Sequence, residues 1–470
     1  MRFIHTIAVI LLLTALLVAV VHAQEDLRLV VVSYEGWEQL QQLASWGLQI
    51  INYQGNVLAA LCSDEQIERL QRSGFQVQVL DAKPDADLKH YYLAYPTPGD
   101  DLAQWPPVEA LYPYGRGVYI VKATTAQVES LARKGIQVAK LPTAVVLSRI
   151  LPDAYQPAGK LAYRRSIQAM VDAVSPTLLI HHVCKLQDDD CLEYCNDRGT
   201  RYSYASAQLN EAAQYIYQQY KALGMRVTYE PFLYNSHVMT NVVAELPGMG
   251  PASDHIYILC AHYDSTSNDP YHIAPGADDN ASGSAAVLEA ARVLSRYSYS
   301  YTLRFVHFAG EEQGLLGSAH YAAQAAQRGD VIVGVINLDM IAYESVPPND
   351  HIVEIHAGTN PASIALADVF MNQITKYGLL LRPEKVTSGA TGRSDHASFW
   401  NQGYPAILGI EDFQDFNPYY HSTNDTLSRL QTQMMVEFTK ACVATLAELA
   451  FVSPRPLPKS MPPNDYPPNW

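Results

Sequence analysis

The first third of the chain alternates short apolar segments with short amphipathic helical segments. Between residues 24 and 145 the order is strand–helix–strand–strand–helix–strand, which is typical of a ferredoxin-like α+β unit. The segment from residue 56 to residue 81 recurs from residue 117 to residue 142. The positions that the second copy shares with the first are Gln127, Glu129, Leu131, Arg133, Gly135, Gln137 and Val138. We therefore predict a small N-terminal α+β region, residues 24–145, with two ferredoxin-like repeats.

From about residue 160 to residue 452 the apolar pattern becomes longer and changes period. Helical spacing predicts helices over 167–184, 205–223, 282–297, 315–327, 361–377 and about 427–451. Apolar runs predict strands over 226–231, 240–246, 256–262, 302–308, 331–339, 351–356 and 405–410. Strands that alternate with helices indicate a three-layer α/β/α domain with a mostly parallel, mixed central sheet.

Both ends of the chain have patterns of their own. Residues 1–23 resemble a secretory signal peptide, with Arg2, an apolar run over 7–21 and a small-x-small cleavage site at 21–23. An uncleaved membrane anchor is the alternative, but the run is short for a bilayer span. We expect a secreted or periplasmic protein without stable membrane association after cleavage. Residues 453–470 are proline-rich, which predicts an extended or disordered tail.

Composition and charge narrow the possible partners. The chain has 470 residues, 48% of them apolar, and a formal net charge of −15. This acidity argues against nucleic acid as a partner. Export permits disulfides, and the cluster Cys184, Cys191 and Cys195 predicts a local bridge, either Cys184–Cys195 or Cys191–Cys195. A zinc site there is a weak alternative, because no fourth ligand lies nearby.

Polar side chains follow the buried strands of the second region, where each predicted strand ends. They are His262, Asp264, Asp278, Asp279, Glu311, Glu312, Asp339 and, further on, His421. Open α/β sheets bind their ligands outside the carboxyl ends of the strands. We therefore expect these side chains to converge on one pocket.

Hydrolysis of a peptide bond by two metal ions needs a bridging carboxylate, a histidine and a carboxylate for each metal, and a free carboxylate as base. The candidate ligands are His262, Asp279, Glu312, Asp339 and His421. Neighbouring residues of an extended segment point in opposite directions, so Glu311 is predicted to be the general base beside the ligand Glu312. Imidazole and carboxylate together favour two Zn²⁺ ions, with Co²⁺ or Mn²⁺ as alternatives. Asp264 is placed to orient His262.

These motifs resemble those of the co-catalytic zinc exopeptidase family of secreted bacterial leucyl aminopeptidases and aminopeptidase Y. The resemblance covers about residues 160–452. It implies that Asp279 bridges the metals, that one metal has His262 and Asp339, and that the other has Glu312 and His421. It also implies that Glu311 is the base and that Asp395, in the SDHASFW segment, lines or braces the site.

One position departs from the pattern of that family. Some relatives carry a tyrosine three residues before the S-D-H segment, where it helps to hold the oxyanion of the transition state. This chain has Thr391 there. Arg393 or a backbone donor is a possible substitute.

The leading prediction is a secreted zinc aminopeptidase that acts on peptides with a free N-terminus. A carboxypeptidase or dipeptidase on the same scaffold is the enzymatic alternative, and a binding protein that has lost its metals is the non-catalytic one. The N-terminal region has no cluster of catalytic residue types. It is interpreted either as a prodomain that chaperones or inhibits the peptidase or as a permanent accessory module. The sequence leaves the oligomeric state open.

Overall fold

The computed structural model describes most of the chain outside its two ends. The described residues are 27–85, 88–96, 102, 105–114, 118–132, 134, 136–147, 163–187, 199–345, 349–450 and 452–456. The predicted signal peptide, Cys191, Cys195 and residues 457–470 lie outside this range, so their predictions stay predictions. Among the described helices, none combines the length and the apolar character that crossing a membrane requires.

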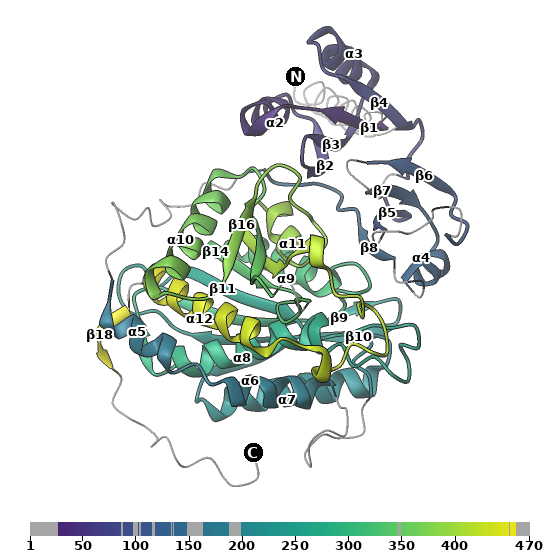
Figure 1. The fold of residues 1–470 in the computed structure, drawn as a ribbon. Helices are drawn as coiled ribbons and strands as arrows, with labels where there is room; N and C mark the ends of the chain where they lie inside the picture. Colours follow the sequence, from purple (N-terminus) through teal and green to yellow (C-terminus); the bar gives the residue numbers. More distant parts are fainter. Residues whose placement is uncertain are drawn as a thin grey trace, which may run out of the picture.

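An eight-stranded sheet forms the centre of the larger part of the molecule (Figure 1). Its strand order is β16-β15-β17-β14-β11-β13-β10-β9. The bounds are β9 Arg226–Tyr234, β10 His237–Leu246, β11 His255–His262, β13 Thr302–Phe308, β14 Val331–Leu338, β15 Ile352–His356, β16 Arg382–Val386 and β17 Ala406–Glu411. Strands β13, β11, β14 and β17 run parallel to one another, whereas β10 and β15 are antiparallel to their neighbours in this group.

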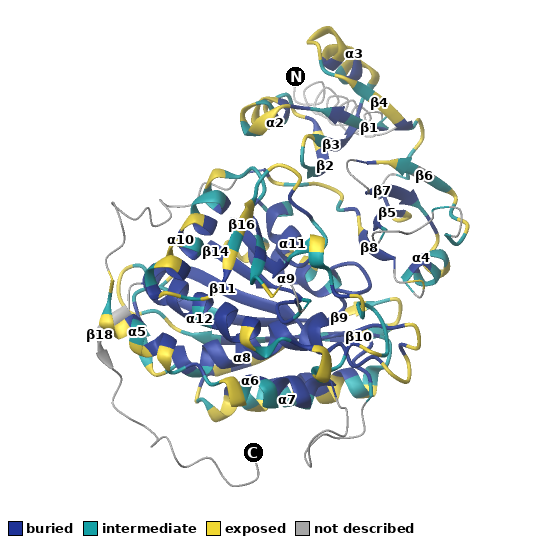
Figure 2. Cartoon of the chain, in the orientation of Figure 1, coloured by how far each residue is buried: buried dark blue, intermediate teal, exposed yellow. Residues whose placement is uncertain are grey.

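Helices cover both faces of this sheet and bury an apolar core on each. One core includes side chains from α5 Arg165–Asp172, α6 Pro176–Gln187, α7 Ser206–Ala222, α8 Gly283–Leu294, α10 Pro361–Tyr377 and α12 Thr432–Leu449. The opposite core includes side chains from α9 Leu316–Arg328 and α11 His396–Asn401. Figure 2 shows the central strands and α8 as buried. The predicted three-layer α/β/α fold with a mixed sheet is confirmed.

Two small antiparallel sheets make up the N-terminal region (Figure 1). The first has β1 Arg28–Ser33, α2 Gly36–Ser45, β2 Gln49–Gln54, β3 Val57–Cys62, α3 Asp64–Arg72 and β4 Val77–Asp81, with strand order β2-β3-β1-β4. The second has β5 Tyr91–Tyr95, β6 Ala110–Pro113, β7 Tyr119–Lys122, α4 Thr125–Ala132 and β8 Gln137–Lys140, with the equivalent order β6-β7-β5-β8. Between β5 and β6 the described residues form no α-helix that would correspond to α2.

The two N-terminal sheets share a core with the larger α/β/α part. Leu93, Tyr95 and Ala139 belong to the same buried cluster as Phe399 and Trp400 of α11. The backbone N–H of Val146 also donates to the carbonyl oxygen of Asn401 at 2.9 Å. The second sheet therefore packs directly on the face covered by α9 and α11.

Some predicted elements differ from the observed ones. The helix predicted over 167–184 is two helices, α5 and α6, because Pro176 cannot continue a helix and begins the next one, where the Ser175 hydroxyl accepts the N–H of Leu178. Strand β16 and helix α11 were not predicted; both are short and lack a long apolar period. Residues Val452–Pro456, which include the start of the predicted tail, pair with β12, Tyr297–Tyr299, as strand β18.

Candidate active site

The parallel strands deliver their polar residues to one edge of the sheet. His262 ends β11, the Glu311–Glu312 pair follows β13 within four residues, and Asp339 comes directly after β14. Asp279 lies in the turn over Ala277–Ser282 that precedes α8. His421 belongs to the loop after β17 and has a positive φ of 52°. All of these side chains are almost completely withdrawn from solvent.

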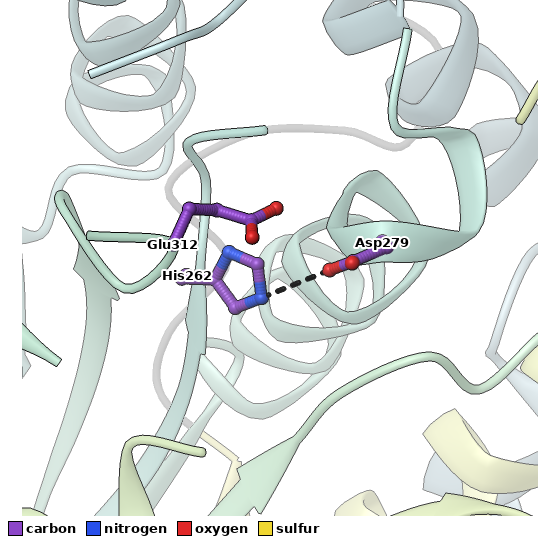
Figure 3. A group of neighbouring side chains, drawn as sticks. All are labelled: His262, Asp279 and Glu312. Carbon is purple, nitrogen blue, oxygen red and sulfur yellow. Dashed lines mark ion pairs between the residues drawn. The ribbon is translucent and has the colours of Figure 1, made fainter. Parts of the chain in front are cut away.

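The carboxylate of Asp279 lies between the two imidazoles. Its Oδ1 is 3.2 Å from Nε2 of His262, and its Oδ2 is 3.2 Å from Nε2 of His421. Asp339 adds a second carboxylate to His262, with Oδ1 at 3.3 Å from Nε2. Glu312 does the same for His421, with Oε2 at 2.9 Å from Nε2. Figure 3 shows His262, Asp279 and Glu312 pointing toward one another.

These contacts fit the separation of metal ligands. The potential ligand atoms of His262, Asp279 and Glu312 all lie within 4.8 Å of one another, as do those of His262, Glu311 and Asp339. Two ligand atoms of one tetrahedral zinc lie about 3.3 Å apart, since each Zn–N or Zn–O bond is about 2.0 Å. Three of the four imidazole–carboxylate distances match this separation, which is at or just beyond the upper end of the range for an N–H···O hydrogen bond. The donor set therefore fits a divalent cation such as zinc.

Burial and mutual charge shift the titration of the site. Burial lowers the pKa of His421, but Glu312 and Asp279 outweigh this effect and raise the pKa to about 10. Burial raises the pKa of Glu312 to about 7, with the charge of Asp279 acting in the same direction. The pKa of Glu311 is well above its usual value, because burial and the carboxylates of Asp339 and Glu312 outweigh the attraction of His262. Four buried carboxylates, those of Asp279, Glu311, Glu312 and Asp339, lie close together. Bound protons or cations are therefore needed to offset their mutual repulsion.

Asp264 contacts the ring of His262 chiefly through its backbone. The Nδ1 atom of His262 contacts the backbone carbonyl oxygen of Asp264 at 3.1 Å, whereas the carboxylate is 3.6 Å away. The carboxylate instead accepts the backbone N–H groups of Glu311 at 3.2 Å and Glu312 at 3.3 Å, and the hydroxyl of Ser203 at 2.8 Å. The two backbone N–H groups of the turn that carries Glu311 and Glu312 therefore donate to the carboxylate of Asp264, which fixes the turn.

A second buried carboxylate fixes the turn of Asp279, and the sequence reading did not single it out. Asp425 accepts the backbone N–H of Asp278 at 3.0 Å and that of Asp279 at 3.0 Å. The Asp278 carboxylate accepts the N–H of Ala342 and the side-chain amide of Asn417. Asp425 lies four residues after His421 in the same motif. Its position beside a candidate metal ligand could have indicated a role at the site.

The loop before α11 forms another wall of the site. Asp395 is fully buried, and burial raises its pKa to about 7. Thr391, at the position where some relatives carry tyrosine, donates its N–H to Nδ1 of His356 at 3.1 Å, and its carbonyl oxygen contacts Nε2 of His396 at 2.8 Å. These contacts hold Arg393 at the cavity in front of Asp279, Glu311 and Asp339.

Gln137 of the N-terminal region also reaches this cavity, and the sequence reading treated it only as a repeat position. Its Nε2 donates to Oε1 of Glu311 at 2.8 Å, and its Oε1 accepts from Nε of Arg393 at 3.0 Å. Its amide also donates to the carbonyl oxygen of Arg393. Both copies of the repeat have glutamine at this position, so the sequence pattern could not predict that Gln137 contacts Glu311.

Comparison with known proteins identifies the relatives of this chain. Residues 241–446 match the family described as "Peptidase family M28". Leucine aminopeptidase 1 of Trichophyton equinum is 31% identical over 314 residues, which cover 63% of this chain and 80% of that protein. A probable aminopeptidase of Saccharomyces cerevisiae is 32% identical over 232 residues, covering 47% of this chain and 60% of that protein.

Solved structures share the fold at lower identity. The LapA aminopeptidase of Legionella pneumophila has a TM-score of 0.58 at 20% identity and covers 77% of this chain and 98% of its own. LapB of the same organism has a TM-score of 0.54 at 18% identity and covers 90% of this chain and 100% of its own. A glutaminyl cyclase of Macrostomum lignano has a TM-score of 0.52 at 19% identity, covering 65% of this chain and 99% of its own.

The sequence relatives and the fold agree with the buried cluster of histidines and carboxylates. The prediction of an enzyme of the peptidase class is confirmed. This chain belongs to peptidase family M28.

Proposed function

We propose that this chain is an aminopeptidase that hydrolyses the first peptide bond of its substrates with two zinc ions. The observation that carries this proposal is the position of Asp279, whose two oxygens face two different histidines. A bridging carboxylate requires that arrangement. The first zinc would be held by His262, Asp279 and Asp339, and the second by Asp279, Glu312 and His421. With three protein ligands, each ion would keep a position for substrate or water.

Glu311 is the proposed general base. The two zinc ions would lower the pKa of a water molecule and polarise the scissile carbonyl group. Glu311 lies at the same cavity as Asp279 and Asp339, and burial raises its pKa above the ordinary range of a carboxyl group. It takes a proton from the attacking water and then gives it to the leaving amine. Asp264 fixes the backbone of Glu311, so the base keeps its direction during both transfers.

The cavity beside the site favours an apolar first residue. The apolar and aromatic residues that line it are Met340, Leu408, Ile410, Phe413, Phe416 and Tyr420. These side chains also form a separate apolar cluster at the end of β17. A leucine side chain would be stabilised there by burial. The names of the relatives in Trichophyton support the same preference.

Charges of both signs at the cavity bear on which end of the peptide is recognised. Asp279, Glu311 and Asp339 line it and suit the ammonium group of a free N-terminus. Arg393 lines it as well and would suit a terminal carboxylate, so a carboxypeptidase is the second candidate. The acidic excess and the names of the relatives favour the aminopeptidase.

We also propose that the protein is exported. The signal-peptide pattern of residues 1–23 is the main support. Cys184, at the C-terminal turn of α6, is disulfide-bonded, which is typical of an oxidising compartment. Cys62, Cys260 and Cys442 are free and buried.

Three peptides with the same leucine-containing sequence test the proposal: one with free ends, one N-acetylated and one C-amidated. Zinc-loaded protein would be assayed both intact and after proteolytic cleavage between residues 148 and 162, which separates the N-terminal region from the peptidase part. The zinc content of each sample would be measured as well. An aminopeptidase cleaves the free and amidated peptides and leaves the acetylated one intact. Cleavage of the acetylated peptide but not of the amidated one would establish the carboxypeptidase. A protein that binds zinc but cleaves none of the three would refute both.

A further inference from the structure

The carboxamide of Gln137 makes a complete set of hydrogen bonds inside the candidate active site. Its nitrogen faces two acceptors, Oε1 of Glu311 and the carbonyl oxygen of Arg393, and its oxygen faces a donor, Nε of Arg393. An amide nitrogen can only donate and its oxygen can only accept, so these partners fix its orientation. The side chain is 6% exposed.

This orientation is the one that a substrate amide needs for the proposed reaction. The nitrogen of the scissile bond must lie near Glu311, which gives the leaving amine its proton. The carbonyl oxygen of that bond must lie near a group that stabilises negative charge. Gln137 places its nitrogen at Glu311 and its oxygen at the Arg393 guanidinium. Its carboxamide thus has the polarity of a peptide bond at the reacting position.

With Gln137 in place, the site has no room for a substrate. The cavity lined by Gln137, Glu311 and Arg393 has a volume of about 30 Å³. That space holds a few water molecules, whereas pockets for small ligands measure ~300 Å³ or more. A peptide can therefore reach Glu311 only after Gln137 has left.

Rotation of the side chain alone would still leave strand β8 packed beside the site, because this strand is held against the peptidase part. Gly314, two residues after Glu312, packs so closely on β8 that a Cβ atom there would lie 2.8 Å from the carbonyl oxygen of Val138. Tyr95, which pairs with Gln137 across β5 and β8, donates to the carbonyl oxygen of Gly392 at 3.3 Å. The guanidinium of Arg393 lies 5.8 Å from the ring centre of Tyr95. The whole second sheet must therefore move away.

We propose that Arg393 binds the carbonyl oxygen of the scissile peptide bond, and that Gln137 occupies the place of that bond in the intact chain. Residues 27–147 are then an inhibitor that is part of the same polypeptide. This inference rests on the proposed function, because it assigns a substrate atom to Arg393. Arg393 would then stabilise the oxyanion of the transition state, the role that a tyrosine has in some relatives at the position of Thr391.

A protease recognition sequence placed between residues 148 and 162 tests the inference in the folded full-length protein. Hydrolysis of leucine p-nitroanilide would be measured before and after the cut, over a dilution series that lets the two pieces separate. We expect kcat/KM to rise at least ~10-fold on cutting, because several buried polar contacts hold the site closed. At high concentration the released piece should raise KM and leave kcat unchanged, as a competitive inhibitor does.

Gln76 provides a matched control for Gln137. It occupies the same position in the first copy of the repeat, but its side chain is exposed. Gln137→Ala should weaken inhibition by the released piece ~10-fold or more, since charge-assisted hydrogen bonds are lost. Gln76→Ala should leave inhibition unchanged. Equal effects of the two variants would overturn the assignment of Gln137.

Arg393→Ala in the cut chain tests the other half of the inference. We expect kcat to fall ~100-fold or more with a small change in KM, because an oxyanion donor acts mainly in the transition state. The same variant should also weaken inhibition by the released piece, whereas a purely structural role would not link these two effects. Wild-type kcat in this variant would overturn the role of Arg393.

Two outcomes separate this inference from the proposed function. If the intact and the cut chains hydrolyse the anilide at the same rate, the inhibitor role is wrong and the aminopeptidase stands. If neither hydrolyses it with zinc bound, the proposed function fails and this inference fails with it.

Discussion

Glu311 and Glu312 are adjacent in the chain, yet their carboxylates have different surroundings. Glu312 contacts His421 at 2.9 Å, whereas Glu311 contacts Gln137 at 2.8 Å. The backbone N–H groups of both residues are held by one carboxylate, that of Asp264. At this scale the site depends on a fixed turn that directs two like side chains to two different partners.

Glu311→Gln in the cut chain should retain zinc and lose kcat by ~100-fold or more, because the variant cannot accept the proton of water. Asp279→Ala should lose zinc, since both proposed sites share this carboxylate. Activity on leucine p-nitroanilide and zinc content by atomic emission check both variants. Loss of zinc from the Glu311 variant, or full activity in it, would contradict its role as base.

At the scale of elements, the parallel strands β13, β11, β14 and β17 place polar residues at one edge of the sheet. The loop after β17 adds a histidine and an aromatic group to the same edge. Phe416 packs against Phe413 with ring centres 6.0 Å apart and against Tyr420 at 5.0 Å. Tyr420 stacks on His421. This loop therefore joins the apolar wall of the cavity to a proposed zinc ligand.

Phe416→Ala in the cut chain should reduce the preference for leucine over alanine p-nitroanilide by ~10-fold, because part of the apolar surface that would bury a leucine side chain is removed. The ratio of the two kcat/KM values measures this preference. Tyr419→Ala is the matched control, since Tyr419 belongs to the same loop and its ring instead faces the guanidinium of Arg429. The same drop in both variants would show that the loop has collapsed.

At the scale of the whole molecule, the site stores unfavourable charge that zinc would neutralise. Without metal, protons take part of this role, because the pKa of His421 is about 10 and that of Glu312 about 7, both above their ordinary values. A group whose pKa is raised by folding stabilises the folded state at low pH. That contribution is lost as the pH rises through the raised pKa.

The metal-free protein should therefore lose thermal stability between pH 6.5 and pH 10, the ordinary and the raised pKa of His421. Zinc binds the neutral imidazole and the ionised carboxylates, so its stabilising effect should grow over the same range. Thermal unfolding with a chelator and with zinc, at steps across this range, measures both trends. A metal-free protein whose Tm rises with pH would contradict this account of the site.

Local patterns were enough to predict most of the larger fold. Apolar periods and chain breakers act over a few residues, so the helix over Pro361–Tyr377 and the succession of strands and helices along the first N-terminal unit followed directly from them. Strand β16 and helix α11 could not be predicted in this way, because both are short and have no apolar periodicity. The helix predicted over 167–184 failed at Pro176, where a local rule opposed the period.

The sequence by itself determined the kinds of residue at the site and the edge of the sheet where they meet, because a strand end fixes where its next residue lies. It could not determine which atoms face each other. The pairing of Asp279 with both histidines and the contact of Asp264 with the glutamate turn depend on distances between segments far apart in the chain. Gln76 and Gln137 are equivalent in the repeat, and only the packing of β8 on the peptidase part brings Gln137 to Glu311.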